Sequence, residues 1–194
     1  MSTTKDLSQL IDREMGKGQG PFLIRICQDA GLLPKVKRGG WRAMEDLTAE
    51  HLADFVIVVA GTRAAGERNV MGARTAVERF AALTCDWEDE RGVRTLRDDI
   101  ADFLGQYRDR LQIGDGYHAL RILFVSDERD PEVEIHLIST DADGPERVLN
   151  YAGPEAEPSS VREAVVIQGG LFLELGGLLR PPAAEEDAPE EATA

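Results

Sequence analysis

The sequence predicts an α+β fold in which an N-terminal helical bundle over residues 1–112 precedes a small antiparallel β-meander with a closing helix over residues 113–180. Apolar residues recur every three or four positions through the first segment, which is the period of amphipathic helices. After the glycine-rich turn at residues 114–116, apolar and polar residues alternate, which is the period of half-buried strands. This change of period divides the chain into two predicted domains.

Length and charge exclude several classes of protein. The chain has 194 residues, 42% of them hydrophobic, which is enough for one domain or two small ones. Its net charge of −14 is uneven, because residues 1–80 carry a balance of +2 and residues 81–194 a balance of −16. No window approaches the roughly 20 apolar residues of a membrane span, and no signal peptide is visible. We therefore expect a cytoplasmic protein with any anion-binding surface in its first half.

Five helices are predicted in the first segment, each bounded by capping residues or glycines. They cover residues 6–15, 21–30, 48–60, 68–84 and 95–112. In the second helix, one set of residues is expected to share the buried face: Phe22, Leu23, Ile26, Cys27 and Ala30. Gly31 is its expected C-cap. The third helix is so apolar that we expect it to be buried on more than one side, and to be interrupted by Gly61 and Gly66.

The second segment is predicted to form an antiparallel meander of three or four strands. The strand candidates are residues 119–125, 133–139, 147–152 and 162–167. The apolar run at 169–179 is expected to form a short helix that closes the sheet. The last 14 residues hold five acids and no bases, so we expect a disordered acidic tail from residue 181.

Positive charge is concentrated immediately after the second helix. Four basic residues stand there with no acid among them: Lys35, Lys37, Arg38 and Arg42. The Gly39-Gly40 pair can supply a tight turn, so residues 35–44 could form a small β-hairpin that carries Trp41. The alternative without a binding role is a helical scaffold with a basic surface loop, in which Trp41 only covers the core.

Four short motifs follow one another in this region. They are Ile24-Arg25, Gly31-Leu32-Leu33-Pro34, Arg38-Gly39-Gly40-Trp41-Arg42, and Thr48-x-Glu50-x-Leu52. In this order they resemble the DNA-binding head of MerR-type winged helix-turn-helix regulators, whose recognition helix precedes a basic wing. Ile26 and Cys27 stand where the family has paired tyrosines, and the family's long dimerising coiled coil has no counterpart. The chain as a whole resembles uncharacterised small proteins of bacteriophages and prophages.

The resemblance implies a set of DNA-binding residues, namely Arg25, Gln28, Lys35, Lys37, Arg38, Trp41 and Arg42. Arg25 and Gln28 would face the major groove. The other basic residues would lie along phosphates, which gives a salt-dependent affinity before any specificity. Trp41 would pack the wing or stack near the sugar backbone.

No catalytic residue, cofactor or metal site is predicted, so we do not expect an enzyme. Residues 16–20 lack the order of a phosphate-binding loop, and no serine has a paired histidine nearby. The three histidines lie on separate expected elements: His51, His118 and His136. Three carboxylates on the polar face of one helix are interpreted as solvated: Asp98, Asp99 and Asp102. Cys27 and Cys85 form neither a zinc site nor a disulfide framework, and Cys27 should be a small core residue.

We therefore expect a phage- or prophage-type DNA-binding protein that acts as a homo-oligomer. It would be either a transcriptional regulator or a packaging factor such as a small terminase subunit, with residues 22–45 on the DNA. The alternative is an acidic protein-interaction module without DNA binding. In that case the acidic second half would engage a basic protein partner, as a host-factor inhibitor or a DNA mimic.

Overall fold

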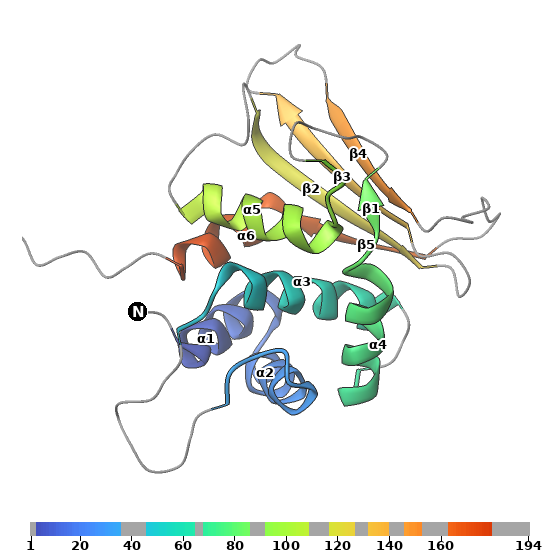
Figure 1. Cartoon of the computed structure of the whole chain (residues 1–194). Coiled ribbons are helices and arrows are strands. Elements are labelled where there is room, and N and C mark those ends of the chain that lie inside the picture. Colours follow the sequence, from blue (N-terminus) through green and yellow to red (C-terminus); the bar gives the residue numbers. More distant parts are fainter. Residues whose placement is uncertain are drawn as a thin grey trace, which may run out of the picture.

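The computed structural model describes residues 3–35, 46–64, 68–85, 92–108, 117–126, 132–139, 146–152 and 163–179. Within these ranges it contains six helices and a five-stranded antiparallel sheet (Figure 1). The helices are α1 (Thr4–Met15), α2 (Gln19–Ala30), α3 (Ala49–Ala64), α4 (Val70–Phe80), α5 (Leu96–Arg108) and α6 (Gly169–Gly177). The strands are β1 (Thr84–Cys85), β2 (Tyr117–Ser126), β3 (Glu132–Ser139), β4 (Arg147–Ala152) and β5 (Glu163–Gln168). The predicted α+β class, with helices first, is confirmed.

The strands follow the order β1-β4-β3-β2-β5 across the sheet. Three consecutive strands, β2, β3 and β4, pair antiparallel as the predicted meander. The fourth predicted strand, β5, returns to the free edge of β2, which makes the four strands a Greek key. The short β1 was not predicted, and it pairs with the end of β4.

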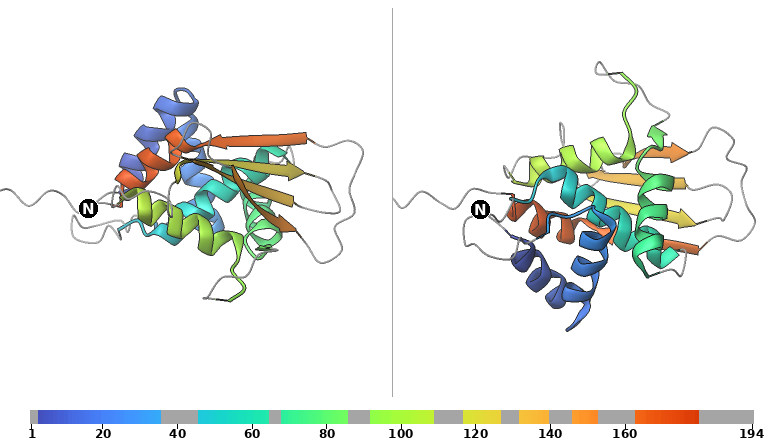
Figure 2. Two further views of the ribbon diagram at one scale, coloured as in Figure 1. Left: turned by 90° about the horizontal axis from the view of Figure 1, so that it is seen from above. Right: turned by 60° about the horizontal axis from the view of Figure 1, so that its bottom comes forward.

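Alternation along the strands gives the sheet two different faces. The inner face is buried and is made of Ile122, Phe124, Val133, Ile135, Leu137, Leu149, Tyr151 and Ile167. The residues between them form an outer face that is more polar and includes the exposed Val148 and Val166. Both α3 and α6 contact β2 and β5 beneath the inner face, so the helices of the described chain lie on one side of the sheet (Figure 2).

The apolar α3 is the central element of the molecule. Every residue from Leu52 to Ala60 is buried, as the sequence predicted for a helix covered on more than one side. The sheet lies on one side of α3, while α1 and α2 lie on the other (Figure 1). Buried side chains from both predicted segments belong to one hydrophobic cluster, and the rings of Phe80 in α4 and Phe124 in β2 meet edge to face at 5.4 Å. The division into two domains stays a prediction.

Gly61 does not interrupt α3, which continues to Ala64, so this expectation from the sequence was wrong. The residue lies where α4 crosses α3. A Cβ atom at Gly61 would stand 2.9 Å from Ala76 Cβ and 3.2 Å from the Phe80 ring. Close helix packing therefore outweighs the roughly 1 kcal/mol by which glycine disfavours a helix interior.

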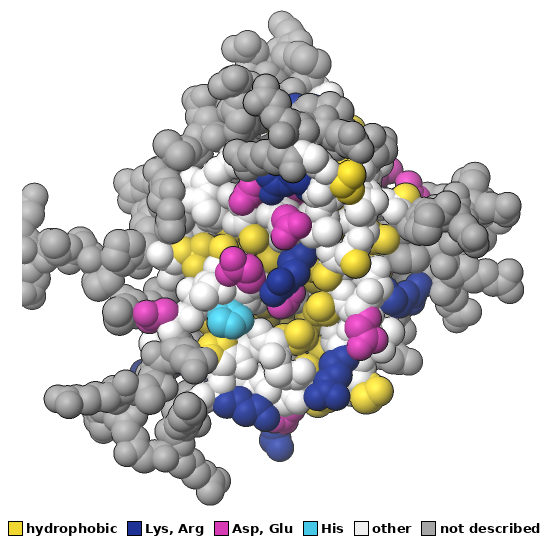
Figure 3. Space-filling view, in the orientation of Figure 1, with side chains coloured by type: hydrophobic (Ala, Val, Ile, Leu, Met, Phe, Trp, Pro, Cys, Tyr) yellow, Lys and Arg dark blue, Asp and Glu magenta, His cyan; other side chains and the backbone are white. Residues whose placement is uncertain are grey.

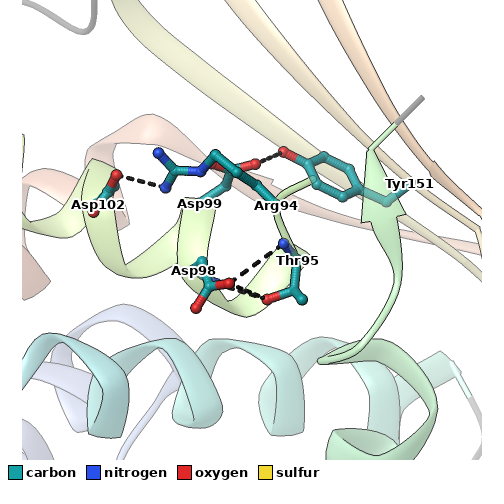
Figure 4. Close-up of polar contacts among 6 residues, drawn as sticks. All are labelled: Arg94, Thr95, Asp98, Asp99, Asp102 and Tyr151. Atoms are coloured by element: carbon teal, nitrogen blue, oxygen red, sulfur yellow. Dashed lines mark hydrogen bonds and ion pairs between the residues drawn. The ribbon is translucent and has the colours of Figure 1, made fainter. Parts of the chain in front are cut away.

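Asp99 is not solvated, which corrects the interpretation of the aspartates on α5. Its side chain is buried and binds Tyr151 of β4 and Arg94 of the segment before α5 (Figure 4). Tyr151 Oη donates to Asp99 Oδ2 at 2.5 Å, and Arg94 Nε lies 2.6 Å from Oδ1. Arg94 also binds Asp102 at 2.5 Å. This cluster fastens α5 to β4, and burial followed by the hydrogen bond to Asp99 raises the pKa of Tyr151.

Parts of the sequence-based expectations fall outside the described residues. These are the basic hairpin beyond Lys35, the interruption at Gly66 and the acidic tail from residue 181. Within the described ranges, no helix combines the length and the apolar character that a membrane crossing requires.

Candidate nucleic-acid interface

The turn between α1 and α2 is built on glycines in the left-handed region. Gly16 has a φ of 105° and Gly18 a φ of 88°, conformations that other residues adopt with strain. Gly18 is the N-cap of α2 and has no side chain to accept a hydrogen bond from the first turn. Asp12 of α1 takes this role, because its Oδ1 accepts from the Gly20 backbone N–H at 2.7 Å. The first helix therefore caps the second.

Gly20 also sets the distance between these two helices. A Cβ atom there would lie 2.0 Å from the Ser8 carbonyl oxygen, which is well inside van der Waals contact. Only glycine lets α2 approach the α1 backbone this closely. The glycine-rich turn thus holds α2 against α1 in one orientation.

The inner face of α2 is buried as predicted, with one exception. Leu23, Ile26 and Cys27 lie in the core, but Phe22 is 45% exposed, so its assignment to the buried face was wrong. Because helical neighbours are three and four residues apart, Phe22 shares an outer stripe with Arg25 and Asp29. The Arg25 side chain is 84% exposed. The outer stripe of α2 (Phe22, Arg25 and Asp29) thus combines an apolar ring, a cation and a carboxylate.

The C-terminal end of α2 is closed by backbone and side-chain contacts. Gly31 adopts a φ of 83°, and its N–H bonds to the Gln28 carbonyl while the Leu32 N–H bonds to Cys27 O at 2.8 Å. This is the Schellman arrangement, so the predicted C-cap is confirmed. Arg74 of α4 donates to the Ala30 carbonyl at 3.3 Å, which places a cation at the negative end of the helix.

Arg25 and Lys35 converge on one carboxylate. Lys35 Nζ lies 3.3 Å from Asp29 Oδ1, and Arg25 Nε lies 3.8 Å from Asp29 Oδ2. Exposed pairs of this kind contribute about 0.5 kcal/mol or less, since water screens them. Both cations can therefore leave Asp29 for a stronger anion at little cost.

The remaining predicted site residues divide into two groups. Gln28 is half-buried, and its Nε2 donates to the Pro34 carbonyl at 2.8 Å, so its amide holds the segment that leaves α2. Reading a base with this amide would require breaking that hydrogen bond. The other four lie outside the described residues: Lys37, Arg38, Trp41 and Arg42.

The sequence did not identify Phe22 as part of the outer stripe of α2, or Arg74 as a residue that lies beside it. Arg74 lies 44 residues from its partner Ala30, and no local motif signals such a contact. Phe22 could have been found from its spacing, since it lies three residues before Arg25 and therefore on the same side of the helix. Figure 3 shows basic side chains at the lower end of this face, over α2 and α4.

Cys27 has no chemical role in this surface. It is fully buried, as predicted, and burial raises the pKa of its thiol to about 12. Cys85 is buried as well.

No protein-family model, curated protein or solved structure matches this chain.

Proposed function

We propose that this chain is a DNA-binding protein of the regulator or packaging type found in phages and prophages. In this proposal α1 and α2 form a helix-turn-helix, α2 enters the major groove of duplex DNA, and residues 35–45 form the basic wing. The observation that carries the proposal is the outer stripe of α2. Its arginine is 84% exposed on a helix whose opposite side is packed into the core.

The three side chains of the stripe suit the edges of bases. An arginine binds the two acceptors of guanine, a phenylalanine can contact the methyl group of thymine, and a carboxylate can accept from the amino group of cytosine. Lys35 and Arg74 flank the stripe near the end of α2, where they could reach phosphates. In the proposed complex Arg25 and Lys35 exchange Asp29 for DNA.

The test is fluorescence anisotropy with a labelled random-sequence duplex at low salt, comparing the full-length chain with Arg25→Ala. Loss of one good guanine or phosphate contact costs about 1–3 kcal/mol, so we expect affinity to fall about tenfold. The Lys35→Ala variant should lower the slope of log affinity against log salt by about 0.9.

Arg121→Ala is the matched control. Arg121 is also an exposed arginine, but it lies on β2 in the outer face of the sheet. The Arg121→Ala variant should bind DNA with the affinity of the wild type. No binding by the wild type at low salt, or equal losses in Arg25→Ala and Arg121→Ala, would reject the proposal.

The acidic protein-interaction module is the second candidate, and one observation favours it. No described helix covers the outer face of the sheet, where His136 lies 2.8 Å from Glu134 and 2.7 Å from Glu146. A basic polypeptide could bind these carboxylates. Binding of a poly-lysine peptide that is lost in Glu134→Gln/Glu146→Gln, in a chain that does not bind DNA, would favour this function.

A further inference from the structure

The two edges of the sheet differ in length and chemistry. One edge is β1, which has only two residues. The other is β5, and β2 is the only strand of the described chain that pairs with it. Natural edge strands usually carry a lysine, a proline or a bulge that prevents pairing with another chain. The centre of β5, from Ala164 to Ile167, has no charged residue and no proline.

The neighbouring helix turns away from this edge. Although α6 begins at Gly169, directly after β5, it packs against α5, β2 and α1. It continues from the end of β5 and contacts β2 beneath the sheet (Figure 2). The described helices in contact with β5 are α3 and α6, and α3 lies under the inner face.

Side-chain direction restricts how a second copy could pair with β5. Ile167 faces the core and Val165 packs against it, whereas Val166 is 44% exposed on the outer face. Residues opposite each other in an antiparallel pair point to the same face. A two-fold axis at Val166 satisfies this condition, because Val166 then faces its own copy and Val165 faces Ile167 of the second copy. Pairing Val165 with Val166 would set a core-facing residue opposite an exposed one.

We propose that a second copy of this chain binds the edge of β5 that no strand of the described chain pairs with, in antiparallel register about Val166. The two sheets become continuous, and their inner faces join through Val165 and Ile167. Such an interface is isologous, since the same patch serves both copies. The proposal does not depend on DNA binding, and either one can fail without the other.

The test is size-exclusion chromatography with light scattering, using the full-length chain over a range of concentrations. We expect a mass of twice 21.3 kDa for the wild type. Val166→Lys should give a monomer, because the two lysines would lie directly opposite each other at the axis and their like charges would repel. A wild type that stays monomeric at every concentration would overturn the proposal.

Val148→Lys is the matched control. Val148 is 40% exposed on the same outer face, close to the 44% of Val166, but it lies in β4 near the opposite edge. This variant should remain a dimer. If both variants dissociate, the outer face and not the β5 edge holds the copies together. If neither variant dissociates, the dimer uses another surface. Either of these two results would reject the proposed register.

A cysteine at the axis tests the register without depending on the stability of the lysine variant. Opposed residues of an antiparallel pair have Cα atoms about 4.5–5.5 Å apart, which a disulfide can span. Val166→Cys should therefore form a covalent dimer on mild oxidation, and Val148→Cys should not. The native cysteines are buried and should not interfere. A Val166→Cys chain that dimerises in solution without crosslinking would contradict the register.

Discussion

At the scale of single residues, the described chain places several polar groups where their partners come from distant elements. Asp99 binds Tyr151 across 52 residues, and Asp54 of α3 accepts from Arg97 of α5 at 2.6 and 2.8 Å. Asp54 is only 5% exposed, and its hydrogen bonds are the largest cause of the raised pKa of Arg97. Buried carboxylates of this kind depend on their partners, because an unpaired one is costly in the protein interior.

The Tyr151 hydroxyl should contribute measurably to stability. Tyr151→Phe keeps the ring in the core but removes the donor to Asp99, which leaves a buried carboxylate oxygen without that bond. We expect the free energy of unfolding to fall by about 1–3 kcal/mol in urea denaturation. In a double-mutant cycle with Asp99→Asn, the two losses should be clearly non-additive. Additive losses would show that the short contact contributes nothing.

The thiol of Cys27 should make stability depend on pH in the alkaline range. Its pKa is raised from 9.0 to about 12, so the unfolded chain releases a proton that the folded chain retains. The stability that the protonated Cys27 thiol gives the folded chain is fully present below pH 9. It is lost as pH rises towards 12, at up to about 1.4 kcal/mol per pH unit. Urea denaturation of the wild type and Cys27→Ala checks this. The stability difference between the two should change over that range and stay constant below it.

At the scale of elements, two glycines allow helices to approach each other. Gly20 brings α2 onto the α1 backbone, and Gly61 brings α3 onto α4. Neither role follows from a helix propensity, which would treat both residues as weak points. The orientation of α2, and with it the direction of Arg25, depends on the first of these contacts.

Alanine substitutions at three helical glycines should therefore change the free energy of unfolding in opposite directions. Gly20→Ala and Gly61→Ala introduce a Cβ atom 2.0 Å from Ser8 O and 2.9 Å from Ala76 Cβ, so each should lower the free energy of unfolding by about 1–3 kcal/mol or more. At Gly105 in α5, a Cβ atom would have no neighbour within 4 Å. Gly105→Ala should raise stability by about 0.5–1 kcal/mol. Chemical denaturation measures all three, and a destabilising Gly105→Ala would contradict this expectation.

At the scale of the whole molecule, α3 connects the helices to the sheet. It contacts α2, α4 and α5 as well as β2 and β5, and its buried residues belong to the same cluster as the inner face of the sheet. A helix in this position has no solvated face. That explains why its sequence lacks the amphipathic period of the other helices.

We expect the helices and the sheet to unfold in one cooperative transition. Calorimetry should give one peak with equal calorimetric and van 't Hoff enthalpies, and the helical and β-sheet spectroscopic signals should be lost together. Phe80→Ala removes a ring that contacts Phe124, so it should lower stability by about 3–5 kcal/mol and shift both signals equally. Two separate transitions would instead support independent domains over residues 1–112 and 113–180.

The sequence predicted the secondary structure better than it predicted contacts. The positions of the helices, the three-stranded meander, the closing helix and the C-cap at Gly31 are confirmed, because their signals are local periods and caps. The helix predicted over residues 68–84 ends at Phe80, and Thr84 lies in β1 instead. Gly61 and Asp99 were misjudged, since the contacts of each come from another element of the fold. Phe22 was wrongly assigned to the buried face of α2. The proposed DNA-binding role of Arg25 and Lys35 remains a prediction.

The sequence by itself determined where helices and strands form and which faces are apolar, because neighbours along the chain decide backbone conformation and period. The tertiary structure alone decided that β5 lies at an edge of the sheet and that Arg74 closes the C-terminal end of α2. Those arrangements depend on close packing between elements separated by many residues, and local propensity contains no information about them.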